Sequence, residues 1–364
     1  MQNTKLAIVG GFLGAGKTTA ILALGTSLRA KGLRVGIVTN DQGGELVDTR
    51  YLEEHGFSVL EVTGGCFCCN FDQLSQKLDQ MSQQEFPDYI LAEPVGSCTD
   101  LISTIMKPIH GGRAGQFELA PLSVVCDPLR LRRFMQEKQS AFPNEINYLF
   151  SKQLEEAEVI VLNKYDLLQD GEAERMEKFL SERYKGIVIL PVSAKTGAGV
   201  EEWLGCILSA ESRSEKTLDI EYDTYAAAEA SLGWLNLGAE IRGRDGAAFD
   251  GNAFSRALMA DLRERLEANG SEIAHLKLYL VSASDTCKLS CVSIYEEIIE
   301  DKHMATSPSQ CSLIVNLRAC ASPEFLSTAI RGSLDALAHT MALEISQTAH
   351  ESFYPGYPKP KYRM

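Results

Sequence analysis

The feature that most constrains the fold is a glycine-rich segment near the start of the chain, residues 11–18, with the sequence GFLGAGKT. It matches the phosphate-binding pattern G-x-x-x-x-G-K-[ST]. An apolar run over residues 5–9 precedes it, and a helical pattern over residues 18–30 follows it. Glycines let successive backbone N–H groups turn toward one anion, and the positive end of the following helix faces the same anion. The segment therefore predicts a strand–loop–helix unit that binds nucleotide phosphates.

Individual roles follow from this motif. We expect Lys17 to contact the β- and γ-phosphates and the Thr18 hydroxyl to bind Mg²⁺. Lys17 is therefore also a predicted catalytic residue. The predicted phosphate-binding residues are Gly11, Gly14, Ala15, Gly16, Lys17, Thr18 and Thr19.

The first 210 residues alternate between short apolar runs and polar amphipathic stretches. The predicted strands are 6–9, 35–39, 58–62, 89–92, 122–126, 159–162 and 187–192. The predicted helices are 18–30, 72–82, 99–106, 129–136, 151–156, 172–184 and 200–208. Continuous apolar, β-branched runs are typical of strands buried on both faces of a parallel sheet. Residues 1–210 are thus predicted to form an α/β domain with a doubly wound, mostly parallel sheet.

The alternation stops near residue 210, and the rest of the chain has a different pattern. We expect residues 217–350 to form a smaller α+β domain, a sheet with helices on one face. Residues 351–364 are rich in proline and are predicted to be an extended tail. The predicted elements are an extended segment 226–241, a helix 252–268, half-exposed strands 276–282, 289–295 and 311–318, and a long helix 323–345.

A second motif specifies the base. Asn163, Lys164 and Asp166 form an N-K-x-D sequence directly after the apolar run 159–162. The Asp166 carboxylate can accept hydrogen bonds from the ring N–H and the exocyclic amine of guanine, whereas adenine presents the wrong edge. Ser193, Ala194 and Lys195, after the next strand, are the expected companion segment at the guanine oxygen. The alternatives are an ordinary polar turn and a plain ATPase, but three motifs in order favour GTP.

Acidic residues at two strand ends are candidates for the Mg²⁺ and hydrolysis side of the site. Glu93 ends the strand 89–92, and Gly96 follows it at a spacing suited to sensing a γ-phosphate. Asp41 lies in a polar loop after the second strand, where it could contact Mg²⁺ or position the attacking water. Asp41 and Glu93 are therefore predicted catalytic residues and, with Thr18, predicted Mg²⁺ ligands. Solvated loop acids are the competing interpretation.

Three cysteines within four residues, Cys66, Cys68 and Cys69, follow a Gly-Gly pair and a predicted strand. Thiolates are soft ligands, and this spacing can place two or three of them on one Zn²⁺-like ion, with Co²⁺ or Ni²⁺ as alternatives. Buried apolar cysteines and a redox dithiol are the competing interpretations. The residues considered for completing the site are Cys98, His110, Glu45 and Asp48.

Bulk composition narrows the functional class. The formal net charge of −14 argues against a nucleic-acid partner. No apolar run is long enough for a membrane span and no signal segment is seen, so we expect a cytoplasmic protein without a membrane partner. In that compartment the 10 cysteines are expected to be core thiols or metal ligands rather than a disulfide framework.

Together these motifs resemble the CobW-like metallochaperone GTPases, relatives of the urease and hydrogenase nickel-insertion GTPases. The resemblance covers roughly residues 1–210 and is carried by segments 10–19, 40–48, 64–69, 93–96 and 163–166. It implies a GTPase that binds a transition metal at the cysteine segment and uses nucleotide state to retain or release it. It also implies a nucleotide-dependent homodimer and a client metalloprotein, with a corrinoid protein or methyltransferase as one form of client.

The chain also departs from that family. Gly44 stands where many members carry a second acidic residue, no histidine-rich segment is present, and the C-terminal domain lacks the usual R-P-F-H-P-like motif. The first hypothesis is therefore a GTP-hydrolysing metallochaperone with slow intrinsic turnover, because no intrinsic arginine finger is identified. The alternative is a regulatory GTP-binding switch acting on a corrinoid protein or methyltransferase, with structural or redox cysteines.

Overall fold

A computed structural model describes residues 4–43, 47–112, 114–115, 117–136, 142–213 and 215–364. The described chain forms two compact units. The first contains the described residues of 1–42, 48–228 and 358–364, and the second those of 43–47 and 229–357. No helix in the described ranges has the length and apolar character needed to cross a membrane.

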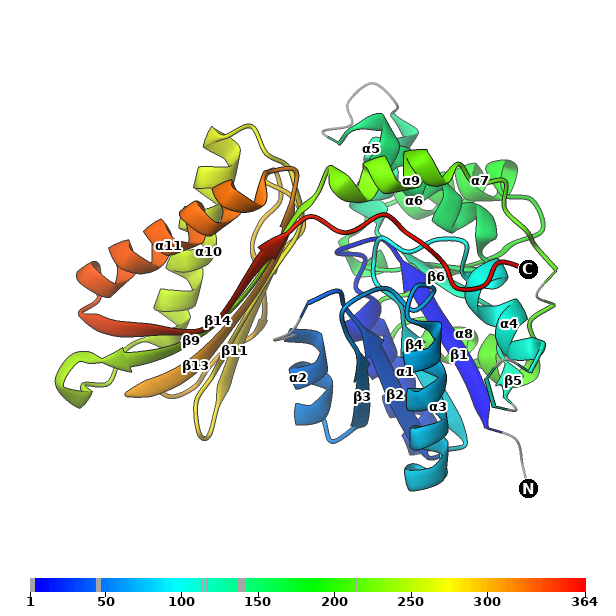
Figure 1. Ribbon diagram of the computed structural model, residues 1–364, viewed down its shortest axis with the longest axis horizontal. Helices are drawn as coiled ribbons and strands as arrows, with labels where there is room; N and C mark the ends of the chain where they lie inside the picture. The colour runs from blue at the N-terminus through cyan, green and yellow to red at the C-terminus, as the bar shows by residue number, and fades with distance from the viewer. Residues whose placement is uncertain (1–3, 44–46, 113, 116, 137–141, 214) are drawn as a thin grey trace. The chain divides into compact units, whose positions relative to one another are not determined.

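The first unit is built on a parallel sheet (Figure 1). Its strands are β1 (Lys5–Gly11), β2 (Val35–Asn40), β3 (Ser58–Val62), β4 (Tyr89–Glu93), β5 (Glu118–Leu119), β6 (Ser123–Cys126), β7 (Val159–Leu162) and β8 (Val188–Pro191). Their order is β3-β2-β4-β1-β6-β7-β8, with β5 also paired to β1, and every pair is parallel. The predicted α/β class and each predicted strand of this sheet are confirmed.

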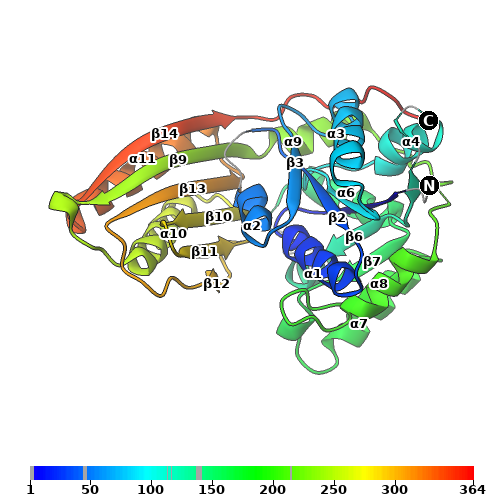
Figure 2. The same cartoon turned by 90° about the horizontal axis from the view of Figure 1, so that it is seen from below.

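Helices cover both faces of this sheet, with α1 and α3 on opposite faces (Figure 2). They are α1 (Lys17–Ala30), α2 (Val47–Glu54), α3 (Phe71–Glu85), α4 (Lys107–His110), α5 (Pro128–Met135), α6 (Asn144–Glu156), α7 (Glu172–Arg183), α8 (Val200–Ser209) and α9 (Tyr222–Ala230). A π-helical turn (Ile102–Met106) leads into α4, and a 3-10 turn (Tyr165–Leu167) follows β7. The apolar side chains of α3 recur at helical spacing, and its buried residues are Phe71, Leu74, Leu78 and Met81. This period explains why the segment forms a helix that packs on a sheet.

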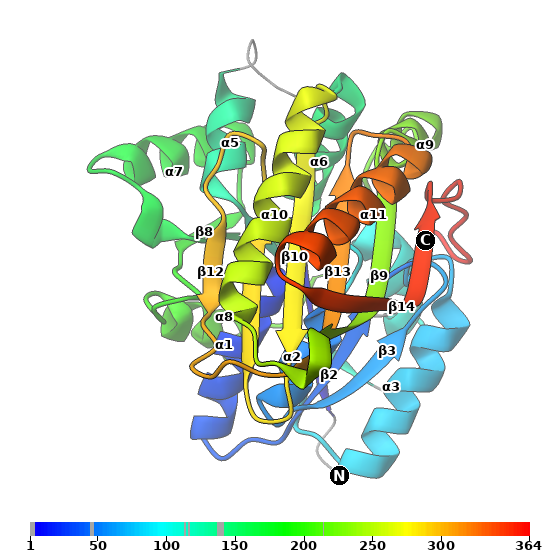
Figure 3. The ribbon, with the colours of Figure 1, turned by 90° about the vertical axis from the view of Figure 1, so that its left-hand side faces the viewer.

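The second unit is an antiparallel sheet with two long helices on one face (Figure 3). Its elements are β9 (Gly233–Gly243), α10 (Gly251–Ala268), β10 (Ile273–Val281), β11 (Thr286–Cys291), β12 (Ile299–Lys302), β13 (Gln310–Ala319), α11 (Pro323–Thr340) and β14 (Leu343–Phe353), with a 3-10 turn at Arg244–Gly246. The strand order is β12-β11-β10-β13-β9-β14. Alternate residues of β9 and β13, such as Leu235, Leu237, Val315 and Leu317, form one core with α10 and α11. Helices on one face of a sheet were predicted for this part of the chain.

Three predicted elements of this region differ from the structure. The strand predicted at 289–295 is β11, Thr286–Cys291, and the chain turns at residues 294–295. The segment 226–241 is not wholly extended, because α9 occupies Tyr222–Ala230 before β9 begins. Alanine has the highest helix propensity, and the run of alanines in α9 outweighs the strand pattern. The predicted helix 323–345 ends at Thr340, since Ala342 adopts a left-handed φ of 52° and β14 starts at Leu343. Because β14 continues to Phe353, the tail predicted for 351–364 is a strand over its first residues.

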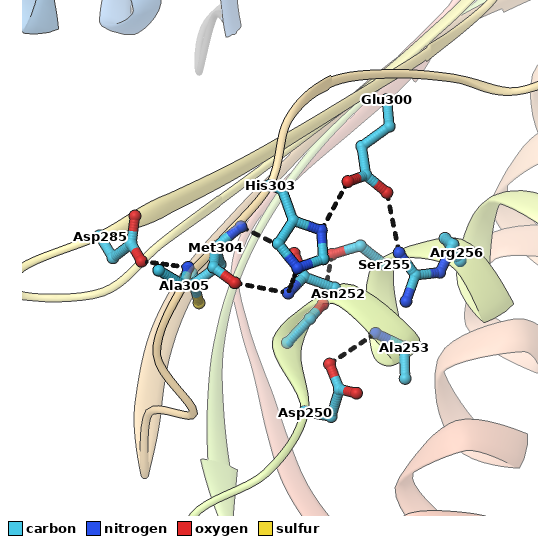
Figure 4. Close-up of polar contacts among 11 residues, drawn as sticks. Asp250, Asn252, Ala253, Ser255, Arg256, Asp285, Glu300, His303, Met304 and Ala305 are labelled. Atoms are coloured by element: carbon cyan, nitrogen blue, oxygen red, sulfur yellow. Dashed lines mark hydrogen bonds and ion pairs between the residues drawn. The ribbon is translucent and has the colours of Figure 1, made fainter.

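A network of polar side chains joins β12, the edge strand of the second sheet, to the start of α10 (Figure 4). Asn252, in the first turn of α10, donates to the carbonyl of Met304 at 2.7 Å and accepts from the Met304 N–H at 2.9 Å. Glu300 of β12 accepts from His303 at 2.5 Å and from Arg256 of α10 at 2.8 Å. These bonds attach the segment after β12 to the start of α10, so we assign the cluster a structural role.

Candidate functional site

The phosphate-binding segment lies between β1 and α1, as its motif predicted. Gly11 has a φ of 132°, and a Cβ there would lie 2.2 Å from the carbonyl oxygen of Val125. Gly16 has a φ of 89°, and its Cβ would lie 2.6 Å from Asn163 Nδ2. Both positions combine a left-handed backbone with close approach of another strand end, so side chains are excluded there. The remaining predicted loop residues lie around them: Gly14 and Ala15 before Gly16, and Thr19 half-buried in the first turn of α1.

Lys17 and Thr18 begin α1 beside the end of β4. The Thr18 hydroxyl donates to Glu93 Oε1 at 3.1 Å, and Lys17 Nζ lies 3.9 Å from the same oxygen and 3.4 Å from the carbonyl of Phe12. All three side chains are buried. A Cβ on Gly96 would lie 3.0 Å from Lys17 Nζ, so the loop after β4 directly abuts the lysine predicted to bind phosphate.

Asn163 connects the base motif to the phosphate loop. Its Nδ2 donates to the carbonyl of Ala15 at 3.0 Å, and its Oδ1 accepts from the backbone N–H of Ala194 at 3.0 Å. Lys164 Nζ donates to the carbonyl of Gly14 at 3.0 Å, and its own φ is 55°. The three predicted segments therefore meet at one edge of the sheet.

Asp166 and Ser193 lie next to each other at this edge, where Ser193 Oγ donates to Asp166 Oδ1 at 2.6 Å. Asp166 is exposed, as is Lys195, so the carboxylate is open to an incoming base. Asp127, which was not predicted from the sequence, is buried, forms an ion pair with Lys164 and caps α5. Burial would raise the pKa of Asp127, but Lys164 and the N–H groups of the helix outweigh burial and hold it below its usual value. Its place directly after a buried strand was the available signal.

The loop after β2 contains another residue that sequence reasoning missed. Asn40 donates to the carbonyls of Val62 at 2.9 Å and Gly65 at 2.8 Å, and accepts from the N–H of Phe67 at 2.8 Å. It therefore holds the backbone on both sides of the first cysteine. Asp41 follows it, is partly exposed, and donates its N–H to Val62 at 3.2 Å.

The cysteine segment folds into a tight turn between β3 and α3. The N–H groups of Cys69 and Asn70 both donate to the carbonyl of Cys66, at 3.1 and 2.9 Å. The sulfurs of Cys66 and Cys68 are 2.9 Å apart, those of Cys68 and Cys69 are 3.9 Å apart, and all three lie within 4.8 Å of one another. Cys66 and Cys68 are buried, and Cys69 is partly exposed. The turn thus gathers three potential metal ligands, which we call the thiol box.

The three thiols do not ionise independently. Hydrogen bonds from Cys68, and then from Cys69, hold the pKa of Cys66 well below the usual value of a thiol. Donation to Cys66 conversely raises the pKa of Cys68, and it raises the pKa of Cys69 to about 11. The box therefore favours one thiolate on Cys66, and a bound cation would favour deprotonation of the other two.

The residues considered for completing the metal site lie outside this group of three sulfurs or outside the described residues. His110 is exposed at the end of α4, Asp48 lies in the first turn of α2, and Cys98 is buried in the loop after β4; within the described ranges none of the three belongs to the metal-ligand group. Glu45 falls outside the described residues. Three other cysteines, Cys287, Cys291 and Cys311, are buried in the core of the second unit, as predicted for core thiols.

Residues 358–364, at the red end of the chain in Figure 1, lie across the thiol box. The N–H of Lys359 donates to Cys69 Sγ at 3.2 Å, and the N–H of Lys361 donates to the carbonyl of Cys68 at 2.9 Å. The ring of Tyr362 packs edge-on against that of Phe71, with centroids 5.2 Å apart. The tail was predicted to be extended; within the first unit its last residues lie against the candidate metal site.

The sequence of this chain is similar to those of known proteins. Residues 5–189 match the family described as CobW/HypB/UreG, nucleotide-binding domain. A protein named zinc chaperone YeiR, from Escherichia coli strain K12, is 30% identical over 166 residues, covering 45% of this chain and 47% of that protein. A protein named zinc chaperone CobW, from a Sinorhizobium species, is 27% identical over 200 residues, covering 48% of this chain and 55% of that protein.

Among solved structures, HypB from Helicobacter pylori in complex with nickel aligns with a TM-score of 0.43 and 14% identity, over 60% of this chain and 92% of that one. The chain spans about half the length of the curated relatives it matches. The matched segment contains the phosphate loop, the thiol box and the base motif. Residues 5–189 are just over half of the 364 residues, and the chain therefore belongs to the CobW/HypB/UreG family.

Proposed function

We propose that this chain is a GTP-binding and GTP-hydrolysing metallochaperone that couples nucleotide state to the binding and delivery of a transition metal. The observation that carries the proposal is the placement of three clustered sulfurs and a complete phosphate- and guanine-binding set at the ends of strands of one parallel sheet. Ligands in open α/β sheets bind at the carboxyl ends of the strands. The names of the zinc chaperone relatives support Zn²⁺ as the cargo, and thiolate ligands also allow Co²⁺ or Ni²⁺.

In the proposed nucleotide site, Asp166 accepts the guanine edge while Asn163 and Lys164 brace the loop beneath it. Lys17 and the backbone of the phosphate loop bind the phosphates. The Thr18 hydroxyl and the Glu93 carboxylate meet 3.1 Å apart as hard oxygen ligands, which fits Mg²⁺. Asp41, in the loop after β2, is the proposed contact to Mg²⁺ or to an attacking water. Phosphoryl transfer depends mainly on such positioning and charge stabilisation, and without an added arginine we expect slow turnover.

In the proposed metal site, Cys66, Cys68 and Cys69 bind the cargo. Tetrahedral thiolates about 2.3 Å from Zn²⁺ lie about 3.8 Å apart. The separation of Cys68 and Cys69 already matches this spacing, at 3.9 Å, and Cys66 must move away from Cys68 by about 1 Å. We propose a client metalloprotein as recipient, with a corrinoid protein or methyltransferase as one form of it, and a nucleotide-dependent homodimer.

The test is a Zn²⁺ titration of the full chain with GDP and with a slowly hydrolysed GTP analogue, repeated on a Cys66→Ser/Cys68→Ser/Cys69→Ser variant. The variant should bind GTP as the wild type does and lose the metal. Equal metal stoichiometry in the variant would contradict the site, and a metal affinity that ignores the nucleotide would contradict the coupling. A wild-type protein that binds GTP but no metal in either state would favour the regulatory-switch alternative.

A further inference from the structure

A fourth cysteine approaches the thiol box from a different element. Cys98 lies five residues after Glu93, on the loop that follows β4, and its side chain is only 1% exposed. Hydrogen bonds link its thiol to those of Cys66 and Cys68, whereas its sulfur is not within 4.8 Å of all three sulfurs of the thiol box, so it must move closer to share a metal with Cys69. The box therefore has a fourth sulfur beside it, which comes from the loop next to the phosphate site.

The backbone around Cys98 is held firmly. Gln153 of α6, itself buried, donates from Nε2 to the carbonyl of Gly96 at 3.0 Å and to the carbonyl of Cys98 at 2.8 Å. The N–H of Cys98 donates to the carbonyl of Val95 at 2.9 Å, closing a tight turn. One side chain thus fixes both Gly96, which abuts Lys17, and Cys98.

The backbone of the residues after Cys98 is fixed by buried side chains from other elements. Asp100 has a φ of 63° and is buried, and its Oδ2 accepts from the hydroxyl of Tyr222 at 2.8 Å and from Arg363 Nε at 2.7 Å. Glu156 accepts from the N–H of Leu101 at 2.7 Å and from the hydroxyl of Thr99 at 3.2 Å. A left-handed non-glycine residue costs energy and persists only where the surroundings over-determine it. This segment is therefore held in one conformation that presents Cys98 toward the box.

We propose that Cys98 is a fourth thiolate ligand, so that this chain binds its cargo metal in a tetrathiolate cage formed by Cys98 with the three cysteines of the thiol box. The proposal rests on the metal-binding function proposed above. Four ligands complete the tetrahedral coordination that Zn²⁺ adopts in closed sites. The N–H of Lys359, 3.2 Å from Cys69 Sγ, offsets part of the negative charge of such a cage.

This arrangement suggests how the cage opens. Three ligands share one turn, whereas Cys98 is attached through Gly96 to the wall of the phosphate site. Because Gln153 bonds both Gly96 and Cys98, a displacement of Gly96 at the phosphate site would carry Cys98 with it. The cage would then keep three ligands and gain an open position for a client ligand. The nucleotide would act through Cys98 rather than through the thiol box itself.

Cobalt substitution tests the ligand. The sulfur-to-cobalt charge-transfer absorption grows with the number of bound thiolates, so at saturating Co²⁺ the Cys98→Ser variant should lose about a quarter of the wild-type absorption. Cys66→Ser should lose a similar share. Cys206→Ser, on α8 and outside the metal-ligand group, is the matched control and should match the wild type. GTP binding by each variant checks that the first unit remains folded.

A Cys98→Ser spectrum identical to that of the wild type, with a reduced Cys66→Ser spectrum, would overturn the proposal and leave the three-cysteine site intact. No sulfur-to-cobalt absorption in the wild type would overturn the metal function as well. If Cys98→Ser does not fold, zinc X-ray absorption of the wild type decides the question. Four sulfurs at about 2.3 Å support the cage, and three sulfurs with one nitrogen or oxygen contradict it.

Discussion

The phosphate loop and the thiol box lie at the same edge of one sheet, but they are constructed in opposite ways. The phosphate loop is one continuous segment whose function lies in backbone N–H groups and in glycines that no side chain can replace. The thiol box has its three sulfurs on one turn, yet Asn40 and the tail hold that turn from other parts of the chain. A local motif therefore specifies the backbone and side chains of the first, which Asn163 and Lys164 then brace, whereas the second depends more heavily on tertiary structure.

The largest expected effect is a loss of GTP affinity that leaves the thiol box unaffected, and it comes from a change at the guanine-binding residue Asp166. In Asp166→Asn, guanine loses two hydrogen bonds to a charged group, each contributing about 1.5–3 kcal/mol, so GTP affinity should fall by about 10²- to 10⁴-fold. Metal binding at the thiol box should be unchanged. Fluorescent nucleotide titration and a Zn²⁺ competition assay measure the two affinities. Asp170→Asn, on the exposed turn that follows, is the control. An unaltered GTP affinity in Asp166→Asn would refute the guanine assignment.

The next effect tests the support of the thiol box. Asn40→Ala removes three hydrogen bonds to the backbone around Cys66, and loss of such supporting contacts lowers metal affinity by about 10- to 100-fold. GTP affinity should change little. Gln80→Ala on the exposed side of α3 serves as the control for a lost amide. Equal losses of metal and GTP affinity would show that the two regions form one inseparable site.

A smaller effect concerns the tail. Removing residues 358–364 takes away the N–H donor that lowers the pKa of Cys69, and one net hydrogen bond contributes about 1 kcal/mol, so the thiolate fraction and the labelling rate of Cys69 at neutral pH should fall by up to about fivefold. Mass spectrometry after brief labelling of the metal-free protein identifies the modified cysteine. Cys206, also partly exposed, reports general changes in reactivity. A Cys69 rate that does not fall would mean that the Lys359 N–H does not stabilise the Cys69 thiolate in solution.

The last prediction concerns the dependence of stability on pH, which we expect to affect metal and nucleotide binding least. Burial, with the charge of Asp100, raises the pKa of Glu156 to about 8 from its ordinary value of 4.5. The folded state therefore holds a proton that the unfolded state releases, so this contribution to stability is full below about pH 4.5 and is lost as the pH rises to about 8. The unfolding free energy should fall over that range relative to Glu156→Gln, which does not titrate. Urea unfolding at several pH values measures it, and parallel curves for the two proteins would contradict the buried acid.

Local patterns predicted some elements well and others poorly. The continuous apolar runs of β1, β2, β4, β6 and β7 identified the parallel sheet because strands buried on both faces leave few alternatives. The hydrophobic pattern did not predict α2, because its short polar sequence resembles a loop. It did not predict α9 either, because a run of alanines shows no helical periodicity of apolar and polar residues. The end of α11 was also misplaced, because its apolar residues continue into β14.

The candidate site shows the same division. Sequence spacing was enough to predict the side chains of the nucleotide motifs and the three cysteines of the thiol box, because their chemistry depends on that spacing. Asn40 and Asp127 were not, because each acts on a segment far away in sequence, and an isolated polar residue after a strand is common in any sheet of this kind. Cys98 was named among several possible ligands, and only its burial and its neighbours distinguish it from His110.

The sequence by itself determined the class of the first unit, the phosphate loop and the presence of clustered thiols, since these follow from backbone conformation and ligand chemistry within short segments. The tertiary structure alone decided that Val47 donates to Asn316 and so belongs to the second unit, and that residues 358–364 return to the first unit and cover the thiol box. Such contacts join residues hundreds of positions apart. Their energies come from groups that no local pattern brings together.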